Sequence, residues 1–119
     1  ISAQDAVNVS ANTCYGNSID GILVNNGASV RDNTCYQNGN NGITASNGAT
    51  ISGNTCYDNT KYGIFTGIGS SLISNTCYSN DLVGMYAGDY CTLDQNTLYD
   101  NHYGNLAAGI GCNLGVNTN

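Results

Sequence analysis

The sequence predicts an all-β solenoid, a parallel β-helix that turns once every 21 residues. Three observations support this fold class: a motif returns at constant spacing, apolar residues fall into fixed columns, and no apolar pattern has a helical period. The motif reads Asn-Thr-Cys-Tyr-x-Asn, with Leu for Cys in its last copy, and its copies begin at Asn12, Asn33, Asn54, Asn75 and Asn96. A unit this short cannot bury its own apolar face, so successive coils must stack.

The chain divides into coils without any insertion, and position 1 of each coil is the first asparagine of the motif. The five full coils are 12–32, 33–53, 54–74, 75–95 and 96–116. Residues 1–11 match the second half of a preceding coil. We therefore expect one domain, residues 1–119, whose open coils predict either a segment of a longer protein or chains that stack end to end.

Three coil positions carry the larger apolar side chains and predict the core. Position 11 holds Ile1, Ile22, Ile43, Ile64, Met85 and Leu106; position 19 holds Val9, Val30, Ile51, Leu72, Leu93 and Leu114; position 3 holds Cys14, Cys35, Cys56, Cys77 and Leu98. Small residues stand two positions away, at positions 13 and 17, as alternation along a strand requires. Each coil is thus predicted to contain three short strands.

Asparagine and glycine recur between these strands and predict the corners. Position 6 is always asparagine, position 10 is glycine in four coils, and position 16 is mostly glycine. Because both residues tolerate a left-handed backbone, we expect the chain to turn at these positions. The asparagine columns at positions 1 and 6 are expected to form ladders of stacked amides that satisfy backbone groups at the corners.

The coil length and the motif resemble those of a known superfamily. The stretch Ile-Ser-Gly-Asn-Thr-Cys-Tyr-Asp-Asn at 51–59, followed by Tyr-Gly-Ile at 62–64, is similar to the short repeats of NosD-type periplasmic proteins, carbohydrate-binding surface proteins and phage tailspikes. All of these resemble the pectate-lyase-like superfamily. The resemblance implies a right-handed parallel β-helix over the whole chain. Its motif is architectural, so it implies no particular activity.

The charge balance excludes several classes of partner. Two basic residues stand against eight aspartates, and the net charge of -6 works against nucleic acid and anionic membranes. No apolar run is long enough for a membrane span. Low charge content favours an extracellular, cell-surface or periplasmic protein.

The cysteines are predicted to be buried, reduced, small hydrophobic residues. Four stand in one column and two in another, each 21 residues from the next. This spacing places the sulfur atoms in a line rather than a tetrahedron, so we predict no metal site and no cofactor.

The largest ordered feature outside the core is a Thr-x-Tyr stripe at positions 2 and 4. The predicted binding residues are Thr34, Tyr36, Thr55, Tyr57, Thr76, Tyr78, Thr97 and Tyr99. A row of aromatic side chains can dock sugar rings or a protein surface. The alternative is that these β-forming residues only stabilise the sheet by stacking. The threonine ladder also resembles the faces of ice-binding proteins, although tyrosine replaces their second threonine.

Ionisable side chains converge on one corner of the last three coils. The candidate catalytic residues are Asp58, Asp81, Asp100 and His102. Asp81 and His102 should be neighbours, and Asp58 and Asp100 should lie two coils apart, ~9.6 Å by strand spacing. That separation is near the upper end for the carboxylates of an inverting glycosidase. A solvated corner is the alternative explanation.

The sequence therefore favours a non-catalytic structural or binding segment that presents the stripe to a polysaccharide or a protein. Self-association, end to end or side by side, is a further expectation. The alternative is a polysaccharide-acting enzyme of the glycoside hydrolase, lyase or epimerase type, or its repeat domain. Ice binding is the minor alternative.

Overall fold

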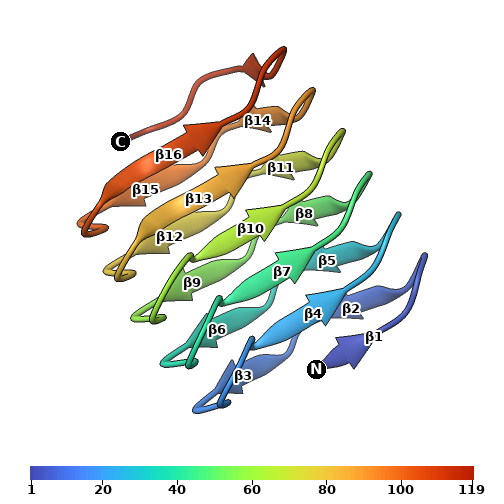
Figure 1. Ribbon diagram of the computed structural model, residues 1–119, viewed down its shortest axis with the longest axis vertical. Helices are drawn as coiled ribbons and strands as arrows, with labels where there is room; N and C mark the ends of the chain where they lie inside the picture. The colour runs from blue at the N-terminus through green and yellow to red at the C-terminus, as the bar shows by residue number, and fades with distance from the viewer.

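The computed structural model describes residues 1–119 as a stack of coils built only from short strands and turns (Figure 1). Every strand pairs in parallel with the strand 21 residues further along the chain, as Ile22 with Ile43 and Thr34 with Thr55 illustrate. Three parallel sheets result, which we name A, B and C. The predicted fold class, coil length and number of strands per coil are confirmed.

The strands follow one another in the order A, B, C along each coil. Sheet A contains β1 (Ser2–Ala3), β4 (Ile22–Val24), β7 (Ile43–Ala45), β10 (Ile64–Thr66), β13 (Val83–Ala87) and β16 (Gly104–Ala108). Sheet B contains β2 (Asn8–Ser10), β5 (Ser29–Arg31), β8 (Thr50–Ser52), β11 (Ser71–Ile73), β14 (Thr92–Asp94) and β17 (Asn113–Leu114). Sheet C contains β3 (Thr13–Tyr15), β6 (Thr34–Tyr36), β9 (Thr55–Tyr57), β12 (Thr76–Tyr78) and β15 (Thr97–Tyr99).

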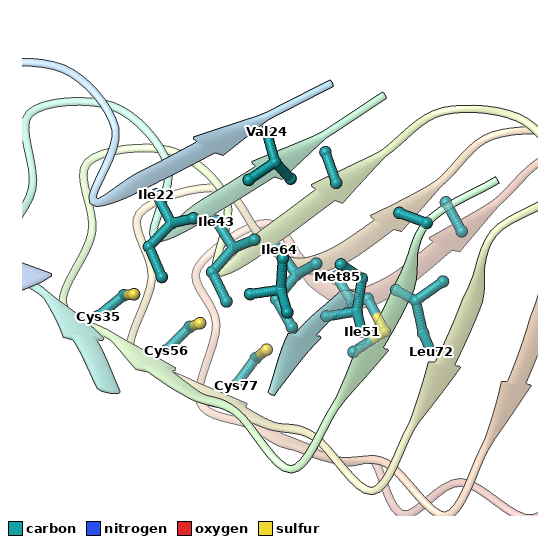
Figure 2. Packing of buried hydrophobic residues seen from close by; sticks show 14 of the residues in the cluster. Ile22, Val24, Cys35, Ile43, Ile51, Cys56, Ile64, Leu72, Cys77 and Met85 are labelled. Carbon is teal, nitrogen blue, oxygen red and sulfur yellow. The ribbon is translucent and has the colours of Figure 1, made fainter. Parts of the chain in front are cut away.

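The core is formed by the three predicted columns. In Figure 2 a row of aliphatic side chains from sheet A faces a row of cysteines from sheet C, and Ile51 and Leu72 of sheet B close the third side. The inner members of all three columns are fully buried. Burial of about 1.5 to 3 kcal/mol per large apolar side chain makes this core the main source of stability.

The asparagines form two ladders inside the corners, as predicted. At position 1, the Asn54 Nδ2 atom donates to the carbonyl oxygen of Val30 at 2.9 Å and to Oδ1 of Asn75 at 3.0 Å. At position 6, the Asn59 Nδ2 atom donates to the carbonyl oxygen of Cys35 at 3.1 Å and to Oδ1 of the next asparagine at 3.0 Å. Each buried amide thus satisfies the backbone of one neighbouring coil and the amide of the other.

The predicted corner positions were wrong in two of three cases. Left-handed backbone occurs at positions 5, 16 and 21, for example at Asp58 (φ 53°), Gly48 (φ 65°) and Asp32 (φ 57°), and not at positions 6 and 10. Position 10 requires glycine for a steric reason. A Cβ atom on Gly63 would lie 2.5 Å from the carbonyl oxygen of Gly84 and 2.8 Å from Nδ2 of Asn80. The corner asparagine of the next coil occupies the space that a side chain would need.

Candidate binding surfaces

The outer face of sheet C carries an unbroken ladder of five tyrosines, which we name the tyrosine stripe: Tyr15, Tyr36, Tyr57, Tyr78 and Tyr99. Consecutive ring centroids lie 4.9 to 5.1 Å apart, and the ring planes differ by 1° to 6°. The first and last rings are 60% and 41% exposed, whereas the three inner rings are half-buried. Because neighbouring rings cover each other's faces, a ligand on the inner rings meets ring edges and hydroxyl groups.

A threonine row runs beside the tyrosines, one residue per coil. Strand pairing holds the row in register, as the partners Thr55 and Thr76 show. The strands β3, β6, β9, β12 and β15 contain no charged residue, so the face is neutral. Asp58 and Asp100 follow the last residues of β9 and β15 and form its charged rim. The stripe therefore offers one threonine and one tyrosine hydroxyl in each coil.

Crowding changes the acidity of the inner tyrosines. Burial raises the pKa of Tyr57 and Tyr78, and the neighbouring phenols and the Asp58 carboxylate raise it further. Both effects disfavour a second negative charge on the ladder. The stripe stays protonated and neutral at physiological pH.

The candidate catalytic residues lie on one corner but form no organised site. Asp58, Asp81, Asp100 and His102 are all exposed. Asp81 and His102 do occupy equivalent positions in adjacent coils, since their amides donate to the carbonyl oxygens of the equivalent asparagines at 2.9 and 3.0 Å. The His102 ring packs edge-on against Tyr103, with centroids 4.6 Å apart. No side-chain hydrogen bond or ion pair joins the four residues.

A second aromatic surface lies on the outer face of sheet A and was missed by the sequence analysis. This aromatic cluster consists of Tyr62, Phe65 and Tyr86. The Phe65 and Tyr86 rings stack with centroids 4.9 Å apart, while the Tyr62 ring is tilted by 43° and 51° to the other two. The Nδ2 atom of Asn41 donates to Oγ1 of Thr44 beside it at 2.9 Å. The available signal was alternation, because position 12 lies between two buried columns.

The six thiols are free, and no group of three or more His, Cys, Asp or Glu side chains is arranged to hold a metal ion. The chain has no helix of the length and hydropathy that a membrane crossing needs. The candidate surfaces are therefore the stripe and the cluster, with the acidic corner between them.

Comparison with known proteins identifies the fold. The family described as the right-handed β-helix region matches residues 1–119. The crystal structure of the periplasmic alginate epimerase AlgG superposes with a TM-score of 0.79 at 18% identity, over 97% of this chain and 36% of that protein. The A-module of the Azotobacter vinelandii mannuronan C-5 epimerase AlgE4 superposes with a TM-score of 0.58 at 13% identity, over 93% of this chain and 52% of that one.

The chain thus spans about a third of the AlgG structure and half of the AlgE4 module. A search of curated protein sequences finds no match. At this level of identity the likeness concerns the fold, and it confirms the pectate-lyase-like resemblance.

Proposed function

The chain belongs to the right-handed β-helix family, and from this membership we propose that it is a non-catalytic polysaccharide-binding segment. In this proposal an extended, neutral glycan lies along the tyrosine stripe, parallel to the solenoid axis. The two structural neighbours are named for epimerisation of alginate and of mannuronan, which are linear polysaccharides. AlgG is periplasmic, and we propose a periplasmic or extracellular location here as well.

The observation that carries the proposal is the regular spacing of the stripe. Its rings repeat every 4.9 to 5.1 Å, and each coil adds a threonine hydroxyl at the same interval. An extended polysaccharide also repeats its hydroxyl groups at regular intervals along its axis. A sugar unit over each coil would meet the same donors and acceptors, with tyrosine edges supplying apolar contact.

Charge selects the kind of glycan. The net charge of -6 repels a polyuronate, and the rim aspartates lie directly beside the stripe. The two basic residues lie off the stripe, Arg31 on sheet B and Lys61 at the turn toward sheet A. A neutral chain of hexoses avoids this repulsion.

The proposal is tested by comparing two double variants in affinity electrophoresis through gels of glucomannan, hydroxyethyl cellulose or alginate. Tyr57→Ala with Tyr78→Ala removes the centre of the stripe. Tyr62→Ala with Tyr86→Ala is the matched control, because it removes two tyrosines from the aromatic cluster. We expect a neutral glycan to retard the native protein more than alginate does. We expect the stripe variant to bind about tenfold more weakly, equivalent to ~1.4 kcal/mol.

Tyr57→Phe with Tyr78→Phe keeps the ring stack while removing two hydroxyls, and it guards against a variant that fails to fold. Unchanged binding by both stripe variants, with lost binding by the cluster variant, would move the site to sheet A. Preference of the native protein for alginate would overturn the choice of a neutral glycan.

A second candidate function is catalysis on a polysaccharide at the acidic corner. The observation that favours it is the superposition on two epimerases, together with the adjacent placement of Asp81 and His102. Glycans incubated with the protein would be assayed for new reducing ends, for unsaturated uronate and for changed C-5 configuration. A product formed by the native protein and not by Asp81→Asn with Asp100→Asn would establish this function. A product formed equally by both would exclude those carboxylates.

A further inference from the structure

Four thiols form a straight row inside the core, which we name the thiol column: Cys14, Cys35, Cys56 and Cys77. Strand pairing places each directly beside the next, and the last three are fully buried. Figure 2 shows the sulfur atoms of these three side by side and pointing the same way into the core. Leu98 continues the column in the next coil, also fully buried, so filling this space does not require sulfur.

The thiols of this column interact with one another. The Cys35 thiol lies against those of Cys14 and Cys56, and the Cys56 thiol also lies against that of Cys77. None of the four donates to a backbone carbonyl. The other two cysteines behave differently: Cys91 Sγ donates to the carbonyl oxygen of Gly67 at 3.2 Å, and Cys112 Sγ donates to that of Gly88 at 3.1 Å. Only the column thus has thiols free of backbone partners.

We propose that adjacent thiols of the column bind a soft monovalent metal ion, Cu(I) or Ag(I), in linear two-coordinate geometry. A row of sulfurs cannot supply the tetrahedron that Zn²⁺ requires, but a two-coordinate ion needs only a pair. Thiolates are the ligands that soft ions such as Cu(I) select. Two metal–sulfur bonds of the ~2.3 Å length found with Zn²⁺ span about 4.6 Å, close to the ~4.8 Å between strands.

Proton balance also favours a monovalent ion. Burial raises the pKa of Cys56, so the free column is protonated and uncharged. When the ion displaces one thiol proton, a metal–thiolate bond forms, the second sulfur donates a lone pair as a neutral thiol, and one proton leaves to solvent. The product carries no net charge, which avoids the cost of burying one. A divalent ion would have to displace two protons from each pair to reach the same neutrality.

Native mass spectrometry of the reduced protein under anaerobic conditions tests the inference. The protein would be titrated with Ag(I), or with Cu(I) buffered by a weak chelator. Four thiols make two non-overlapping adjacent pairs, so we expect two ions per chain. Each ion should add the mass of the metal minus one proton. Zn²⁺ at the same concentration should add nothing.

Three double variants that each remove two thiols separate the column from unspecific binding. Cys91→Ala with Cys112→Ala should still bind two ions. Cys14→Ala with Cys35→Ala leaves one adjacent pair and should bind one. Cys35→Ala with Cys77→Ala leaves two thiols that are two coils apart and should bind none.

The last two variants have identical composition, so thiol count alone predicts that they bind equally. Equal binding by them, or binding lost with Cys91 and Cys112, would overturn the inference. A thermal melt of each apo variant identifies loss of folding, and in that case Cys35→Val with Cys77→Val would replace the alanine pair.

Discussion

The tyrosine stripe and the aromatic cluster are built from the same kinds of side chain and differ in regularity. In the stripe, identical residues repeat in every coil, so Tyr57 and its neighbours lie parallel within 6° and cover each other's faces. In the cluster, unlike residues meet, and the Tyr62 ring is tilted by 43° and 51° to its neighbours. Exact repetition therefore produces a long, even surface of edges and hydroxyls, whereas irregularity produces a short surface with an open ring face.

This difference decides what each surface can recognise. A long, even surface suits an extended ligand whose own units repeat, because every coil adds the same contact. A tilted ring suits stacking of one apolar ring face, since aromatic groups prefer offset or edge contacts to face-to-face packing. The stripe and cluster variants proposed above measure this difference directly.

The largest expected effect comes from breaking the corner that joins the two surfaces. Asn59 lies between the end of β9 in the stripe and Tyr62 in the cluster. Replacement by leucine leaves the carbonyl oxygen of Cys35 and the Asn38 amide without their partners in a buried place. At about 1–3 kcal/mol for each unsatisfied group, we expect Asn59→Leu to lower the free energy of unfolding by about 3 kcal/mol. Urea denaturation measures it.

Asn17→Leu is the matched control for this corner. Asn17 occupies the exposed end of the same ladder and interacts only with the next asparagine, Asn38. We expect its replacement to cost about 1 kcal/mol. Equal losses at both positions would contradict the role given to the buried ladder. Loss of the near-ultraviolet signal of one surface only would show that stripe and cluster fold independently.

A smaller effect is expected from Gly63→Ala, which acts at the cluster end of the same corner. The added methyl group would lie 2.5 Å from the Gly84 carbonyl oxygen and 3.0 Å from Cβ of Cys77 in β12. Such overpacking costs about 1–3 kcal/mol, and we expect about 2 kcal/mol in thermal or urea unfolding.

Gly48→Ala is the control for backbone strain. Gly48 has a φ of 65°, and nothing lies within 4 Å of its would-be Cβ atom. The left-handed conformation alone should cost about 1 kcal/mol. A loss at Gly48 as large as that at Gly63 would mean that conformational freedom, rather than space, explains the glycine column.

These two glycines also show what the sequence could predict. The core columns follow from spacing alone, because a residue such as Ile64 repeats its environment every 21 positions. The corners do not, since the left-handed residues at position 5 include Gln37 and Asp58, whose types share no turn signal. Gly63 is required by an asparagine one coil away, a contact that only the folded chain creates.

The surfaces were predictable to the extent that they repeat. The stripe was found because tyrosine recurs in every coil, and the cluster was missed because Phe65 and Tyr86 share a column with leucine, threonine and alanine. At the acidic corner, spacing correctly placed Asp81 beside His102. It could not say that the His102 ring turns toward Tyr103, because rotamers depend on local packing. The roles of the stripe and corner residues stay predictions.

The smallest expected effect distinguishes the stripe by its acidity. The pKa of Tyr57 and Tyr78 is raised in the folded protein, first by burial and then by neighbouring phenols and Asp58. An unfolded tyrosine ionises near pH ~10. Above that pH the unfolded chain has released protons that the folded stripe still holds, so stability should fall as pH rises from about 10 toward the folded pKa. Below pH ~10 these groups should make stability independent of pH.

Phenolate absorbance during alkaline titration checks this assignment. Tyr57→Phe should remove part of the late-titrating signal. Asp58→Asn removes one negative charge from the rim, so it should move the titration of Tyr57 and Tyr78 back toward ordinary phenol values. An unchanged titration in Asp58→Asn would leave burial as the sole cause. Titration of the native stripe at ordinary values would mean that the stacked inner rings are open to water, which would weaken the contrast with the cluster.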